Sequence, residues 1–136
     1  MERLKEEITN LVLIGKINKQ DEKYINKKKL LTFLKSDLGI MIKNSNFVKK
    51  EQEFILKDKN ISKSVIQGVI DLYFVNENGN IVLIDFKTDK ISDEELFITR
   101  YKKQLEIYKV ALEKITGKIV EKTYIYSFNL DKKIEI

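Results

Sequence analysis

The chain has 136 residues, of which 43% are hydrophobic and 35% charged, proportions that fit one globular domain with a modest core. It contains neither cysteine nor histidine, which excludes disulfides, thiolate metal sites and imidazole catalysis from its own residues. Any metal must be held by oxygen, which favours magnesium or manganese. The net charge of +5 is compatible with a nucleic-acid partner, but taken alone it favours a lysine-rich solvated surface.

Short helices are predicted for the first third of the chain. Periodic apolar residues indicate a helix over 2–14, which Gly15 ends. Further helical patterns cover 19–25, 27–34 and 36–42, the last capped by its first residue. The N-terminus is amphipathic and does not have the character of a signal peptide, and no apolar run is long enough to cross a bilayer. With the absence of cysteine, these features lead us to expect a cytoplasmic protein without a membrane partner.

The middle of the chain is strand-like. Residues 47–57 predict a strand, and the polar stretch 58–64 ends it. Two apolar runs follow, over 65–75 and 81–87, and the asparagine- and glycine-rich stretch 76–80 between them predicts a hairpin turn.

A long helix and a final strand complete the pattern. Ser92 and Glu95 form a capping box, which predicts a helix that ends at Gly117. Residues 119–130 alternate as a strand, and 134–136 predict a short edge strand. The main apolar stripe of the helix is Leu105, Tyr108, Leu112 and Ile115. The strand has Tyr124, Tyr126 and Phe128 on one face and Ile125 on the other. This order predicts an α+β fold with a mixed sheet.

The two hairpin runs each carry a carboxylate among apolar residues, Asp71 in the first and Asp85 in the second. Such a carboxylate is costly to bury unless a partner compensates it. Asp85 and Lys87 share one face of their strand because they are two residues apart. A two-residue turn would place Asp71 opposite Phe86 and aim it at the other face. A loop centred on Asn78, or a bulge, places Asp71 opposite Asp85 instead.

A divalent cation would relieve the repulsion between Asp71 and Asp85, and the carbonyl of Phe86 is a further oxygen ligand. Such an ion acidifies a water and neutralises phosphate charge, while Lys87 positions the water or holds the phosphate. The alternative is a purely structural pairing of Asp71 with Lys87, which a lone D-x-K motif would favour.

The long helix supplies more polar groups that bear on this choice. Gln104 and Tyr108 are four residues apart, so they share one helix face, and both can reach the phosphate or its water if the helix packs on the hairpin. Arg100, Lys102 and Lys103 lie nearby and can contact backbone phosphates. The full set of polar residues favours a site that acts on phosphate.

Three segments resemble the RecB-like branch of the PD-(D/E)XK nuclease superfamily: GVID at 68–71, IDFKTD at 84–89 and QLEIY at 104–108. KEQEF at 50–54 is similar to the Arg-Glu-x-x-Phe strand of that branch, and 123–128 resembles its last core strand. The motifs are similar to those in the C-terminal nuclease domain of AddA, which is part of the bacterial AddAB helicase–nucleases. The fold that this resemblance implies is a restriction-endonuclease-like αβββαβ core.

The resemblance implies that Asp71, Asp85 and the Phe86 carbonyl bind magnesium or manganese, and that Lys87 is the catalytic lysine. Glu51 is either a helper near the metal or a structural residue. The residues implied to contact DNA are Thr88, Arg100, Gln104 and Tyr108, of which Gln104 and Tyr108 also line the catalytic site.

We expect residues 1–136 to be one nuclease domain, with a helical lead-in over 1–46 and the PD-(D/E)XK core over 47–136. The histidine that RecB-like nucleases usually carry upstream is missing, and no G-x-x-x-x-G-K-[ST] phosphate loop occurs. A fragment of a longer helicase–nuclease explains both absences. The implied partners are DNA, the helicase part of the full-length chain and a second helicase–nuclease subunit.

The resemblance implies metal-dependent exonuclease activity on DNA in double-strand-break repair and recombination. Two alternatives stay open. One is a DNA-binding or assembly module without turnover, which the missing histidine suggests. The other is a stand-alone RecB- or Cas4-like nuclease, although the absence of cysteine disfavours the iron–sulfur members of that group.

Overall fold

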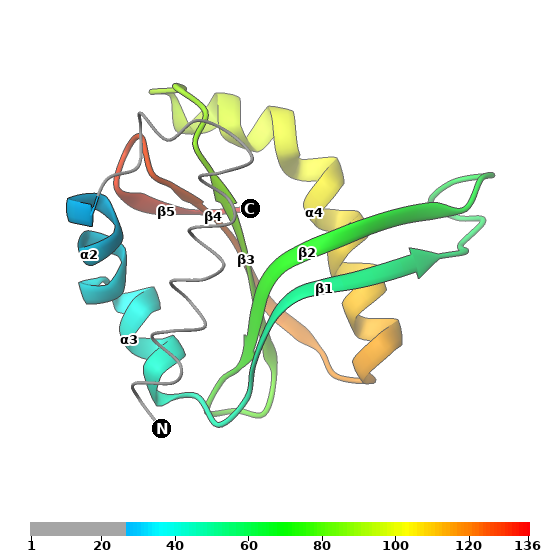
Figure 1. Cartoon of the computed structure of the whole chain (residues 1–136). Helices are drawn as coiled ribbons and strands as arrows, with labels where there is room; N and C mark the ends of the chain where they lie inside the picture. Colours follow the sequence, from blue (N-terminus) through cyan, green and yellow to red (C-terminus); the bar gives the residue numbers. More distant parts are fainter. Residues whose placement is uncertain (1–26) are drawn as a thin grey trace.

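A computed structural model describes residues 27–136, in which one mixed five-stranded sheet lies between two helical layers (Figure 1). The sheet order is β1-β2-β3-β4-β5. Its strands are Val48–Leu56, Ile66–Val75, Ile81–Lys87, Val120–Ser127 and Lys132–Glu135. The helices are α2 (Lys27–Lys35), α3 (Asp37–Asn44) and α4 (Glu94–Thr116). The helices predicted over 2–14 and 19–25 lie outside the described residues.

The connections confirm the predicted α+β, restriction-endonuclease-like arrangement. β1, β2 and β3 pair antiparallel, and β5 pairs antiparallel with β4 at the edge of the sheet. β3 and β4 are parallel, and α4 is the crossover between them. No helix within residues 27–136 is both long and apolar enough to span a membrane.

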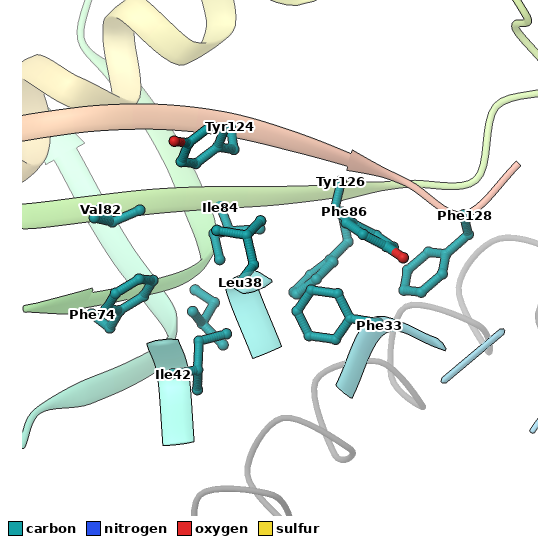
Figure 2. Packing of buried hydrophobic residues seen from close by; sticks show 11 residues of the cluster. Phe33, Leu38, Ile42, Phe74, Val82, Ile84, Phe86, Tyr124, Tyr126 and Phe128 are labelled. Carbon is teal, nitrogen blue, oxygen red and sulfur yellow. The ribbon is translucent and has the colours of Figure 1, made fainter. Parts of the chain in front are cut away.

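Every residue of β3 is buried, because this central strand has helices over both of its faces. Ile84 and Phe86 face α2 and α3, where they join the hydrophobic cluster drawn in Figure 2. Phe33 of α2 packs against the aromatic members of that cluster, edge-on to Phe86 and Tyr126 with ring centroids 5.2 and 4.7 Å away. Packing on this face leaves the alternate residues of β3, which include Asp85, directed toward α4.

The ends of α4 agree only in part with the sequence-based predictions. Gly117 ends the helix in the left-handed conformation, with φ 70°, as predicted. The predicted Ser92 cap is wrong: Asp93 is the N-cap, and its carboxylate accepts the amide of Glu95 at 3.0 Å. Ile115 is 50% exposed, so it does not belong to the buried stripe, whereas Ala111 and Leu112 do.

Replacing Asp93 with alanine should lower the free energy of unfolding by about 1 kcal/mol, because it removes the acceptor that satisfies an amide of the first turn. Ser92→Ala is the matched control and should leave stability unchanged within about 0.5 kcal/mol. Urea denaturation followed by circular dichroism measures both variants. A larger loss of stability in Ser92→Ala than in Asp93→Ala would show that Ser92 is the N-cap and contradict the assignment to Asp93.

Candidate active site

The hairpin turn fixes the register of the two acidic strands. Val75 pairs with Ile81, so five residues form the turn, and it is centred on Asn78 as the shared face of the two aspartates requires. The Asn76 side chain accepts the amides of Asn78 and Asn80, each at 3.0 Å. These local bonds select the odd-numbered loop in preference to a two-residue turn.

The strands β2 and β3 separate where the aspartates lie. Their paired register ends at Leu72 and Ile84, and one position further on it would bring Asp71 opposite Asp85. Asp71 Oδ2 accepts the backbone amide of Phe86 at 2.9 Å, so a side chain takes the place of a ladder hydrogen bond. β1 and β2 continue together past this point as a paired extension beyond the rest of the sheet (Figure 1).

The backbone of β1 is unusual at the same level. Glu51 has φ 48°, which is left-handed and uncommon for a residue other than glycine. It lies between Lys50 and Gln52, whose partners flank Asp71, so Glu51 lies across from Asp71. The Glu51 side chain is exposed. Both of its proposed roles, metal helper and structural residue, remain predictions.

The ammonium group of Lys87 lies among three groups. Its Nζ is 2.9 Å from Asp85 Oδ2 and donates to Gln104 Oε1 at 3.2 Å. The ring of Tyr101 faces it, with 4.2 Å from Nζ to the ring centroid. Asp85 is 2% exposed and Lys87 8%, so this is a buried ion pair. Lys87 therefore pairs with Asp85, whereas the structural alternative drawn from the sequence paired it with Asp71.

Helix α4 brings the predicted glutamine and tyrosine to this ion pair. Gln104 Nε2 donates to the hydroxyl of Tyr108 at 3.1 Å, which fixes the orientation of the amide toward Lys87. Burial raises the pKa of Tyr108 to about 12, and the negative charges of Asp85 and Asp71 add to this effect. The phenol is therefore neutral near pH 7. Solvent can reach the site past three partly buried residues, Asp71, Gln104 and Tyr108, whereas Asp85 and Lys87 lie deeper.

The oxygen donors suit a hard divalent cation. Asp71 and Asp85 supply carboxylates, and within residues 27–136 no group of three His, Cys, Asp or Glu side chains is arranged to hold a metal ion. The N–H and C=O of one residue in an extended strand leave from the same edge, so the Phe86 carbonyl shares the edge whose amide meets Asp71. Two carboxylates and a carbonyl fit magnesium, which keeps several waters and takes substrate phosphates as its other ligands.

The other residues predicted to contact DNA differ in how exposed they are. Arg100 is exposed and its guanidinium lies 3.4 Å from Asp89 Oδ2, and Lys102 and Lys103 are exposed on the same helix. Thr88 is only 8% exposed, so it offers little surface to DNA. Their contacts with DNA remain predictions.

Sequence reasoning assigned no role to Tyr101 or Asp89. Tyr101, Gln104 and Tyr108 lie at i, i+3 and i+7, which puts all three on one face of α4, so the spacing could have identified Tyr101. Asp89 comes two residues after Lys87 and accepts the Tyr101 hydroxyl. No pattern in a single sequence distinguishes this contact from a solvated loop carboxylate.

Comparisons with known proteins identify the family of this chain. The family model described as the PD-(D/E)XK nuclease superfamily matches residues 2–134. The chain is 40% identical, over 99% of its length, to an ATP-dependent helicase/nuclease subunit from Clostridium botulinum strain 657. The corresponding subunits from C. botulinum strain Hall and from C. kluyveri are 41% and 34% identical, again over 99% of the chain. The chain spans only 12% of the length of each of these curated relatives. It belongs to the PD-(D/E)XK nuclease superfamily.

Proposed function

We propose that this chain is a magnesium- or manganese-dependent nuclease domain that hydrolyses DNA phosphodiester bonds. The observation that carries the proposal is the convergence of Asp71, Asp85 and Lys87: one hydrogen bond of 2.9 Å ties Asp71 to β3, and an ion pair of 2.9 Å joins the other two. A carboxylate pair next to a buried lysine is a costly arrangement for stability alone.

The cation would be held by Asp71, Asp85 and the Phe86 carbonyl. When bound, it supplies an acidified water and a counter-charge for the phosphate. The residues of the chain do the rest: Lys87 holds the water or a phosphate oxygen as a point charge, and Gln104 restricts where that ammonium can lie. Tyr108 presents a neutral phenol that can donate to the DNA backbone.

The wider role follows from the relatives, which are named as helicase/nuclease subunits. We infer that the domain acts in a larger bacterial cytoplasmic helicase–nuclease, with a helicase region in the same full-length chain and a second subunit. Such an assembly would trim DNA ends as an exonuclease during double-strand-break repair and recombination. Thr88 and Arg100 would contact the DNA next to the cleavage site.

Removal of divalent metal tests the proposal. The 136-residue chain should degrade an end-labelled single-stranded oligonucleotide in magnesium or manganese, and EDTA should stop the reaction completely. Replenished metal should restore the rate. Degradation that continues in EDTA would contradict the metal requirement. Binding that persists in EDTA, with no cleavage at any metal concentration, would identify a DNA-binding module instead.

A further inference from the structure

We propose that Tyr101 is a positioning residue for Lys87, chiefly through its ring, and that the bond from its hydroxyl to Asp89 makes a smaller contribution. The proposal rests on the function proposed for Lys87. Its basis is the 4.2 Å distance from Lys87 Nζ to the centroid of the Tyr101 ring, on which the ammonium is stacked. A lysine over the face of an aromatic ring is attracted by the ring quadrupole, most strongly where water is excluded. Lys87 meets that condition because it is 8% exposed.

The Tyr101 ring is held from two directions. Its hydroxyl donates to Asp89 Oδ2, which also lies 3.4 Å from the guanidinium of Arg100. The ring also packs at 6.3 Å between centroids against Phe97, which is fully buried. Burial, with a further contribution from Asp89, raises the pKa of Tyr101 to about 12, so the hydroxyl keeps the proton that it donates.

The bond between Tyr101 and Asp89 connects the two elements that hold the ammonium group of Lys87. Asp89 follows the end of β3, and Tyr101 lies in the second turn of α4, so their bond ties the strand that carries Lys87 to the helix that carries Gln104. Lysine is a flexible side chain that loses much rotamer entropy when it is held in one place. Asp85 and Gln104 bind the ammonium through oxygen atoms, and the Tyr101 ring closes a third side.

Two substitutions separate the ring from the hydroxyl. Tyr101→Leu removes both, whereas Tyr101→Phe keeps the ring and loses only the bond to Asp89. We expect Tyr101→Leu to lower kcat about tenfold with KM changed less than about twofold, and Tyr101→Phe to keep kcat within about threefold of the wild type. Tyr124→Leu is the matched control, since Tyr124 carries another lysine–tyrosine stack, with Lys133 at 5.1 Å on the opposite face of the sheet. It should leave kcat unchanged in the folded fraction.

A spectroscopic measurement makes the test independent of catalysis. A proton over an aromatic face is shielded, so the ε-methylene signal of Lys87 in a ¹³C-lysine NMR spectrum should lie upfield of the exposed lysines. Lys87→Arg assigns the signal by removing it. The upfield shift should persist in Tyr101→Phe and disappear in Tyr101→Leu.

These measurements separate the positioning role from the proposed function. Should the shift be present and Tyr101-dependent in a chain that cleaves no DNA, the positioning of Lys87 would stand and the nuclease proposal would fail. An unshifted Lys87 signal in the wild type, or equal kcat in Tyr101→Leu and wild type, would overturn the role of Tyr101. Equal losses of kcat in the leucine and phenylalanine variants would overturn the role of the ring.

Discussion

Lys87→Ala should lower the rate of DNA cleavage on the order of a thousandfold, which is the loss expected when one positioned charge that stabilises a transition state is removed. Lys87 is the cation within 2.9 Å of Asp85, on the face of β3 that α4 covers. Because the ammonium group is buried, water cannot take over its stabilisation of negative charge in the variant. The rate should be measured in single-turnover reactions with excess protein over labelled DNA.

The alanine variant also leaves the buried Asp85 carboxylate without this partner, which should cost about 3–5 kcal/mol of stability, the usual effect of breaking a buried ion pair. Lys87→Arg separates this effect from catalysis, since it retains a positive charge for Asp85 but replaces the compact ammonium with a planar guanidinium. We expect a folded arginine variant that cleaves roughly tenfold more slowly or worse. Lys118→Ala, an exposed lysine beyond the far end of α4, is the control for loss of charge. Wild-type rates in both Lys87 variants would rule out its catalytic role.

The hairpin and its turn could be predicted from the sequence because their information is local. An asparagine- and glycine-rich stretch between two apolar runs encodes the turn, and Asn76 closes it through bonds to residues two and four positions away. The burial of β3 follows in the same way from its unbroken apolar composition. The shared face of Asp71 and Asp85 was therefore accessible to sequence reasoning once an odd-numbered loop was assumed.

Features that depend on tertiary contacts could not be predicted from the sequence. The positive φ of Glu51 is one of them, because glutamate has no preference for positive φ and only the paired strand β2 shows that Glu51 lies across from Asp71. The contact between Phe54 of β1 and Tyr108 of α4 is a second such feature, because it joins residues far apart in the sequence; the two rings pack edge-on with 5.5 Å between their centroids. The cap at Asp93 is another, since Ser92 and Asp93 are both good N-cap residues and the tertiary fit of α4 decides between them.

Substitutions of Asp71 separate its metal-binding role from its structural one. Asp71→Asn keeps a side-chain oxygen that can accept the Phe86 amide, but it removes one of the two carboxylate charges offered to the cation. We expect this variant to stay folded and to lose cleavage by two or more orders of magnitude, roughly the effect of weakening a bound metal that contributes several kcal/mol to the transition state. Calorimetric titration with manganese should show weaker binding.

Asp71→Ala should lose the same activity and, in addition, about 1–3 kcal/mol of stability, because the Phe86 amide is then left without its acceptor. The control is Glu106→Gln, which removes an equal charge from an exposed position of α4 and should change neither quantity. If Asp71 were only a structural residue, Asp71→Asn would bind manganese as tightly as the wild type and cleave at the same rate. In that case the only effect of Asp71 would be on stability, seen as the difference between the alanine and asparagine variants. Other residues would then have to hold the cation.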